Sequence, residues 1–289
     1  MEQSQRIKFD EIETRLQALV SVPAISGFER ESKLPDIICE LLERYSPEID
    51  SLGNVFMRVG SGGKKILVEA HLDEVGFIKT ANGFVTVGSI GENQINNLVV
   101  GDDGRISYFR RNFEVNGSLV RSPALDNRTG CTALTFLPDL LKDVNAEVYI
   151  AFTTREETTK EGILRVYKKY SPEIVISVDS AYASPYDQRR WQVPECGNGP
   201  AIQIQGPNFF INEYSLIEKI AKRAGIPYQF EIVDSEKGGT NMDALVGEEI
   251  RRFQVNIPVR YQHTNMSETD LRDIKEAILL VSALVKELC

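Results

Sequence analysis

Apolar runs of strand length alternate with segments of helical periodicity along most of this 289-residue chain, and this alternation strongly limits the fold. Strands are predicted at residues 65–70, 147–153, 174–178, 201–205, 229–233 and 251–257. Helices are predicted at residues 9–22, 29–45, 129–141, 161–170, 212–224 and 268–288. We therefore expect an α/β fold, in which a mostly parallel sheet is flanked by helices on both faces.

Three local signals refine this prediction. Pro138 should end or kink the helix at 129–141, and Ser267 is the predicted N-cap of the last helix. The glycine-rich residues 60–63 separate two strand-like runs, at 52–58 and 65–70, which predicts a hairpin turn.

The alternation stops between Gly76 and Arg121. Short β-like pieces in this part are separated by Asn-Gly and Gly-Asp-Asp-Gly turns, without helical periodicity. We therefore predict a small β-rich insertion at residues 76–122. Residues 1–75 and 123–289 are then the two parts of one α/β domain.

Charge and composition exclude several classes of function. A net charge of −9 disfavours broad binding to nucleic acid or to anionic membranes. No apolar stretch approaches the roughly 20 residues that span a bilayer, and the charged N-terminal segment is unlike a secretory signal. The four cysteines are scattered without a Cys-x-x-Cys pair, which indicates reduced thiols. We expect a cytoplasmic protein that binds neither nucleic acid nor membranes.

The chain has only two histidines, and both follow predicted strands. His71 comes directly after the run at 65–70, and His263 lies a few residues beyond the run at 251–257. Neutral imidazole is the commonest nitrogen ligand of zinc-type metals. A single histidine is more often structural, but two of two in matching places favour a metal site.

Carboxylates occupy similar places. Glu156 and Glu157 follow the strand at 147–153, Asp179 follows the strand at 174–178, and Asp126 precedes the helix at 129–141. Ligands of open α/β sheets bind beyond the carboxyl ends of the strands, so we expect these side chains to converge. Solvated charge pairs and turn caps are the alternative interpretation, which the position after strands disfavours.

These residue types suit two divalent cations that share a bridging carboxylate. A nearby carboxylate that binds no metal can accept a proton from water as general base. The adjacent acids Glu156 and Glu157 could divide these roles, and Asp73 could orient His71 through a hydrogen bond. We expect zinc, with cobalt or manganese as alternatives, since imidazole and carboxylate bind all three.

Seven motifs occur in an order that resembles one known family. They are residues 70–77 (AHLDEVGF), 124–131 (ALDNRTGC), 153–157 (TTREE), 178–179 (VD), 197–201 (GNGPA), 238–241 (GGTN) and 257–264 (IPVRYQHT). In this order the chain is similar to the M42 metallo-aminopeptidases, which include glutamyl, deblocking and tetrahedral aminopeptidases. The resemblance covers nearly the whole chain.

The resemblance implies a role for each matching position. Asp126 would bridge two metal ions, of which His71 and Asp179 complete one, while Glu157 and His263 complete the other. Glu156 would be the general base, with Asp73 orienting His71.

Some positions depart from the family pattern. Glu157 is followed by Thr158-Thr159-Lys160 where a Val-Gly-type stretch is usual, and Asn127 and Asn241 replace frequent aspartates. The segment between His71 and Asp126 is also shorter than in typical members, where the inserted domain helps to build dimers and a twelve-subunit cage. Self-association of this chain therefore stays open. The role of Gly239 and Thr240 is also open, between a plain turn and a part of the substrate pocket.

Our interpretation is a two-metal aminopeptidase that removes N-terminal residues from peptides. One alternative is a metal-dependent deacylase or amidohydrolase of N-acyl amino acids or small amides. Its pocket would bind a carboxylate through Arg128, Arg260 or Lys237. The other alternative is a non-catalytic binding protein on a peptidase-like fold. The chain keeps every ligand candidate and Glu156, which argues against this alternative.

Overall fold

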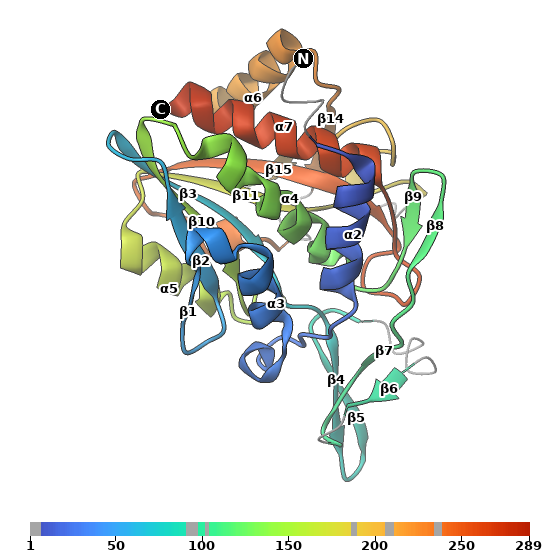
Figure 1. The fold of residues 1–289 in the computed structure, drawn as a ribbon. Coiled ribbons are helices and arrows are strands. Elements are labelled where there is room, and N and C mark those ends of the chain that lie inside the picture. Colours follow the sequence, from blue (N-terminus) through green and yellow to red (C-terminus); the bar gives the residue numbers. More distant parts are fainter. Residues whose placement is uncertain (1–6, 91–97, 102–103, 186–189, 206–210, 234–238) are drawn as a thin grey trace.

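A twisted sheet of twelve strands forms the centre of the part of the chain that the computed structural model describes (Figure 1). The described residues are 7–90, 98–101, 104–185, 190–205, 211–233 and 239–289. Four neighbouring strands run parallel in the middle of the sheet, in the order β10 (Ala146–Thr153), β3 (Lys64–His71), β11 (Ile174–Tyr182) and β15 (Arg251–Arg260). This centre, with its covering helices, confirms the predicted α/β fold.

Strands on both sides of this centre pair with it in antiparallel fashion. On one side lie β2 (Val55–Val59) and β1 (Glu48–Ile49), and on the other β13 (Ala201–Gln205), β14 (Gln229–Val233) and β12 (Arg190–Gln192). β13 is antiparallel to β15 but parallel to β14. Parallel pairing is therefore concentrated in the strands that carry the candidate ligands.

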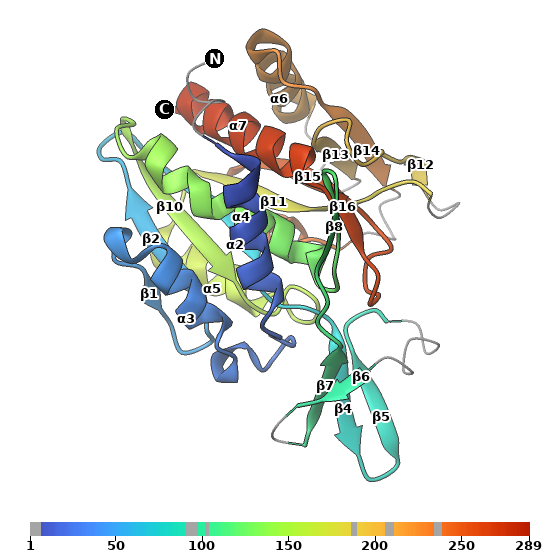
Figure 2. The same cartoon turned by 45° about the vertical axis from the view of Figure 1, so that its right-hand side comes forward.

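Helices cover both faces of the sheet (Figures 1 and 2). Alternate side chains of β3 belong to different hydrophobic clusters: Ile66 and Val68 to the larger one, and Leu67 to the smaller one. The larger cluster includes α2 (Phe9–Val20), α3 (Leu34–Leu41), α4 (Leu125–Leu141), α6 (Ile211–Ala224) and α7 (Leu271–Leu288). The smaller cluster includes α5 (Glu161–Tyr170) and the 3-10 helix η5 (Asn241–Leu245). Burial of both faces explains why the central strands are continuous apolar runs.

The predicted hairpin between the first two strand-like runs is wrong. β10 lies between β2 and β3, antiparallel to β2 and parallel to β3. The glycine-rich turn instead crosses the beginning of β10 at close range. A Cβ atom on Gly60 would lie 2.4 Å from the carbonyl oxygen of Ala146, and one on Gly63 would lie 2.1 Å from that of Asn145. These glycines therefore permit a close backbone approach, which a local sequence pattern cannot distinguish from a hairpin turn.

Gly63→Ala is expected to lower the free energy of unfolding by about 2–4 kcal/mol. The estimate adds the cost of a left-handed backbone for alanine to the cost of overpacking against Asn145. Gly117→Ala is the matched control, because Gly117 has a similar φ of 65° but no atom within 4 Å of an added Cβ. Urea unfolding of both variants measures the difference, and equal losses would show that the contact with Asn145 carries no cost.

Two predictions about helix ends are also wrong. The last helix begins at Leu271 rather than 268, and its N-cap is Asp270, whose carboxylate accepts a hydrogen bond from the Arg272 amide (2.9 Å). The preceding residues form β16 (Glu268–Asp270), which pairs with β15 and β9 (Leu119–Arg121). Pro138 does not end α4, which continues to Leu141; a proline lacks only its own amide hydrogen bond, so the last turn can still form.

A separate small sheet projects from the main body (Figures 1 and 2). Its four strands are β4 (Gly76–Thr80), β5 (Gly83–Val87), β6 (Leu98–Val100) and β7 (Ile106–Phe109), in the order β5-β4-β7-β6. The following strands, β8 (Glu114–Asn116) and β9, join the large sheet through β16. Among the described residues, no helix has the length and apolar character needed to cross a bilayer.

Candidate metal centre

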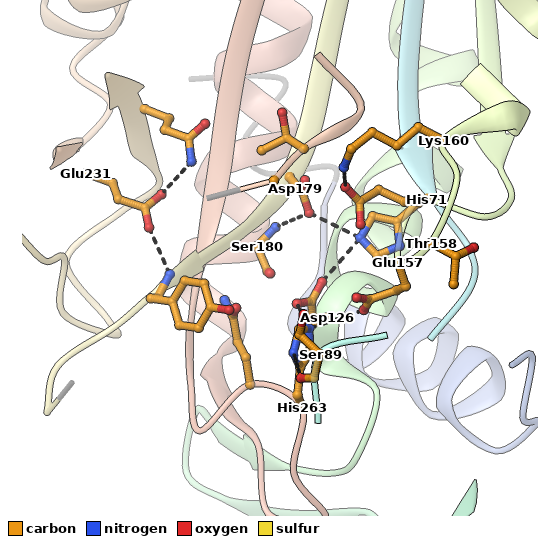
Figure 3. A pocket seen from close by; sticks show the side chains of 16 residues that line it. His71, Ser89, Asp126, Glu157, Thr158, Lys160, Asp179, Ser180, Glu231 and His263 are labelled. Atoms are coloured by element: carbon orange, nitrogen blue, oxygen red, sulfur yellow. Dashed lines mark hydrogen bonds and ion pairs between the residues drawn. The ribbon is translucent and has the colours of Figure 1, made fainter. Parts of the chain in front are cut away.

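The candidate ligands come together at the carboxyl edge of the parallel strands (Figure 3). His71 is the last residue of β3, and Glu157 lies in the turn that follows β10. Asp179 lies within β11, which continues beyond its predicted end to Tyr182. His263 follows β15 and has a left-handed φ of 58°, which is uncommon for non-glycine residues. With Asp126, these side chains line one cavity of about 230 Å³.

Asp126 lies between the two histidines and faces both. Its Oδ1 atom is 3.2 Å from Nε2 of His71, and its Oδ2 atom is 3.2 Å from Nε2 of His263. His71 Nε2 is also 3.3 Å from Oδ1 of Asp179, and His263 Nε2 is 3.2 Å from Oε1 of Glu157. Two groups of three potential ligands therefore share Asp126, and the ligand atoms within each group lie within 4.8 Å of one another.

The other ring nitrogen of each histidine contacts a backbone carbonyl. Nδ1 of His71 is 3.2 Å from the carbonyl oxygen of Asp73, and Nδ1 of His263 is 2.7 Å from that of Ser89. A carbonyl oxygen can only accept a hydrogen bond, so each Nδ1 must carry the proton. In the neutral ring this leaves the lone pair on Nε2, which faces Asp126. Metal-binding histidines in proteins are oriented in this way.

The charges in the centre shift each other's pKa values strongly. Burial alone would lower the pKa of His71, but its contacts with Asp126 and Asp179 raise it well above the ordinary value. Burial alone would raise the pKa of Asp126, but its contacts with His263 and His71 hold this pKa well below the usual range. The site thus strongly favours positive charge between its carboxylates.

Asn127 fixes the backbone that carries Asp126. Asp126 and Asn127 have non-helical dihedral angles at the start of α4. The Asn127 side chain donates to the carbonyl of Val178 (2.8 Å) and accepts from the amide of Gly130 (2.9 Å). Only an amide can donate and accept in this way, whereas an ionised aspartate accepts only. This hydrogen bonding gives a physical reason for asparagine at a position where the family often has aspartate.

Asp73 connects the His71 segment to the acidic turn. Its two carboxylate oxygens accept hydrogen bonds from the amides of Glu156 (3.0 Å) and Glu157 (3.1 Å). Oδ1 of Asp73 is 3.5 Å from Nδ1 of His71, so the backbone carbonyl of Asp73 is the nearer acceptor for the ring. Asp73 therefore holds ligand-bearing segments from two strands at once.

Asp73→Asn is expected to weaken metal binding by about 10–100-fold, the usual effect of removing a group that orients a ligand. The asparagine amide group would place a donor against one of the two backbone N–H groups. Titration with a competing chelator measures the affinity. Asp143→Asn, at an exposed position, is the matched control and should leave the affinity unchanged. Equal affinities in both variants would show that Asp73 does not support the site.

Lys160 is a residue of the cavity that the sequence analysis did not identify. Its Nζ atom lies 2.5 Å from Oε1 of Glu156 (Figure 3). Burial raises the pKa of Glu156 to about 8, although the positive charges of His71 and Lys160 oppose the shift. The departure from the family pattern after Glu157 was the available signal, because it placed a cation close to two acids.

The rest of the cavity wall is polar. Gly239 and Thr240 line it, together with Tyr182, Gln203 and Glu231. The Glu231 carboxylate, on the side of the cavity opposite Lys160, accepts hydrogen bonds from the Tyr182 amide (3.1 Å) and the Gln203 side chain (3.2 Å) (Figure 3). A third hydrogen bond comes from the Asn256 side chain (3.0 Å). Gly239 and Thr240 belong to the motif at 238–241, whereas Tyr182, Gln203 and Glu231 lie outside the seven motifs and were not predicted.

The arginines suggested for a carboxylate pocket do not line the described part of the cavity. Arg128 is fully buried and pairs with Glu74 (3.1 Å), while Arg260 pairs with Glu268 (2.6 Å). Lys237 lies outside the described residues. Cys131 is a packed thiol that donates to the carbonyl of His71 (3.1 Å), and burial raises its pKa to about 12.

Comparisons with known proteins agree with this architecture. A model of the M42 glutamyl aminopeptidase family matches residues 98–280. A lysyl aminopeptidase of Pyrococcus furiosus is 24% identical over 335 residues, which cover 94% of this chain and 96% of the relative.

Two solved structures have the same fold. The aminopeptidase APDkam598 of Desulfurococcus kamchatkensis has a TM-score of 0.86 and 24% identity, with 96% of this chain and 95% of that one covered. The TET1 peptidase of Pyrococcus horikoshii, described as assembling into a tetrahedron or a large octahedral shell, has a TM-score of 0.83 and 22% identity, covering 94% and 98%. The family match spans more than half of the chain, which therefore belongs to the M42 aminopeptidases.

Proposed function

We propose that this chain is a two-metal aminopeptidase that hydrolyses the N-terminal peptide bond of its substrates. One observation carries the proposal: Nε2 of His71 and Nε2 of His263 face opposite oxygens of Asp126, and each Nδ1 contacts a carbonyl. Such a donor set, completed by Asp179 and Glu157, fits two divalent cations of the zinc type. Cobalt and manganese are alternatives with the same donors.

Glu156 is the proposed general base. It belongs to neither ligand group, yet it precedes Glu157 in the same turn and lines the cavity. When bound, the two cations would polarise the scissile carbonyl and lower the pKa of water from 15.7 toward about 7. Glu156 would accept a proton from the attacking water and transfer it to the leaving amine.

The charge of the cavity favours a substrate with a free amino terminus. Five carboxylates line it, and Lys160 is the only lysine or arginine among its described lining residues. The carboxylates are those of Asp126, Glu156, Glu157, Asp179 and Glu231. The two cations would take up Asp126, Asp179 and Glu157, and Lys160 pairs with Glu156 (2.5 Å). Glu231 is then the lining carboxylate left to attract an ammonium group. The charge therefore supports an aminopeptidase over a deacylase of N-acyl amino acids.

A substrate panel tests this proposal. Metal-loaded protein is assayed with aminoacyl anilides and, in parallel, with N-acetyl derivatives of the same amino acids. The proposal predicts that the anilides with a free amino group are hydrolysed and that this hydrolysis requires added metal. Preferential cleavage of the N-acetyl compounds would support the deacylase instead. Failure to cleave either series, together with failure to bind metal, would support the non-catalytic alternative.

We also propose that the chain forms homo-oligomers in the cytoplasm. The small sheet exposes apolar side chains at Phe84 (38%), Val85 (54%) and Val100 (45%), which a second copy could cover. The TET1 peptidase, with the same fold, is itself an assembly. All four cysteines are free, as expected for a reducing compartment. Light scattering during size-exclusion chromatography measures the oligomeric state, and a monomer at micromolar concentration would contradict self-association.

A further inference from the structure

Lys160 reaches the proposed base through a tight turn. The turn after β10 has left-handed residues at both ends, Arg155 (φ 61°) and Lys160 (φ 57°). The amide of Lys160 donates to the carbonyl of Arg155 (2.7 Å), which closes the turn around Glu156 and Glu157. Lys160 is therefore held by its backbone at the start of α5, and its side chain returns over the turn to Glu156.

The ion pair between Lys160 and Glu156 is largely shielded from water. The side chains of Lys160 and Glu156 are only 22% and 8% exposed. Asp179 and Asp243 are the other carboxylates whose charges act on Lys160. Gly239 leaves room for the ammonium group, because an added Cβ there would lie 3.3 Å from Nζ. A partly buried, charge-assisted hydrogen bond of 2.5 Å restricts the Glu156 carboxylate far more than a solvated pair does.

We infer that Lys160 is a positioning residue that holds the Glu156 carboxylate in the orientation from which it accepts the proton of water. The inference rests on the proposed role of Glu156 as base. A glutamate has several rotatable bonds, whereas a general base must stay within hydrogen-bond reach of the proton that it accepts. Lys160 removes this freedom by holding Oε1. A displacement of about 1 Å at such a group can lower turnover by about 100-fold.

Lys160→Met tests this inference, because methionine keeps an unbranched apolar side chain close to the length of the lysine stem but removes the ammonium group. We expect kcat to fall by about 100-fold. KM should change little, as expected for an interaction that matters in the transition state. Lys160→Arg should recover much of kcat, since it restores a cation in the same place. Lys168→Met, at an exposed position on α5, is the matched control and should behave as the wild type.

A crystal structure of Lys160→Met supplies a readout that does not depend on turnover. The inference predicts that the Glu156 carboxylate rotates away from its wild-type position or becomes disordered, while Glu157 stays in place. If Lys160→Met does not fold, Lys160→Gln serves the same comparison. An unmoved Glu156, or an unchanged kcat, overturns the inference.

Two further outcomes identify what failed. A large rise in KM with kcat retained would mean that Lys160 binds a carboxylate of the substrate, which also overturns the positioning role. An active Glu156→Gln variant would instead disprove the proposed base, whatever Lys160 does. The kinetic and crystallographic arms therefore separate a failure of the inference from a failure of the proposed function.

Discussion

Asp126→Asn is expected to remove both metal ions at once and with them nearly all turnover. The two oxygens of Asp126 face different histidines, at 3.2 Å each, so one residue serves both ligand groups. Asparagine keeps one oxygen and replaces the other with an amide group that carries no donor lone pair for a metal. The affinity should fall by more than about 100-fold, since residues that only support a ligand already account for losses of about 10–100-fold.

Elemental analysis measures this effect as metal ions per chain. Wild-type protein loaded with zinc should hold about two ions per chain, one for each ligand group. Asp126→Asn should hold close to none after dialysis. Asp179→Asn is the matched control, because Asp179 belongs to one group only and its loss should spare the ion at Glu157 and His263. If Asp126→Asn retained one ion tightly, Asp126 would not be a bridging ligand.

Glu156→Gln is expected to lower kcat by about 10²–10⁴-fold, the contribution typical of a general base. Glutamine has the same size and keeps an oxygen that can accept the hydrogen bond from Lys160, so the turn should fold as in the wild type. It cannot accept a proton from water. Because Glu156 belongs to neither ligand group, the metal content should not change. Steady-state kinetics on an aminoacyl anilide, together with elemental analysis, measure both quantities.

Glu249→Gln is the control for this substitution. Glu248 and Glu249 are also adjacent acids, but both are exposed and neither lines the cavity. The control should retain wild-type kinetics. Turnover of Glu156→Gln close to that of the control would refute the assignment of the base, and loss of metal from Glu156→Gln would show that Glu156 is a ligand instead.

The sequence predicted elements best where strong periodicity met clear turn residues. The helix Glu161–Tyr170 and the strands Ala201–Gln205 and Gln229–Val233 have the predicted bounds. The helix forms through local hydrogen bonds, and the two strands are short apolar runs. Nearby Gly and Pro residues mark the ends of these segments. Their ends are therefore encoded within a few neighbouring residues.

Non-local pairing was not predictable in the same way. The insertion of β10 between β2 and β3 depends on contacts between segments far apart in sequence, so the glycine-rich turn was interpreted as a hairpin. The beginning of α7 shifted for a similar reason, because pairing with β15 and β9 holds Glu268–Asp270 as strand β16. In both cases tertiary contacts overrode a local signal.

The candidate site follows from a general property of parallel sheets. Parallel strands place their carboxyl ends at one edge, so residues after several strands could be expected to meet there. The sequence could not predict which oxygen faces which nitrogen, nor that a carbonyl of Ser89 orients His263. Lys160 was missed although its position after the two acids was a signal, because its contact with Glu156 depends on the left-handed conformations of Arg155 and Lys160, which cannot be read from their residue types.

Anomalous diffraction from crystals grown with zinc tests the central claim most directly. The account predicts two peaks at the zinc absorption edge, one between His71 and Asp179 and the other between His263 and Glu157, with Asp126 contacting both. A single peak, peaks elsewhere in the molecule, or histidine rings turned away from Asp126 at saturating zinc would contradict it.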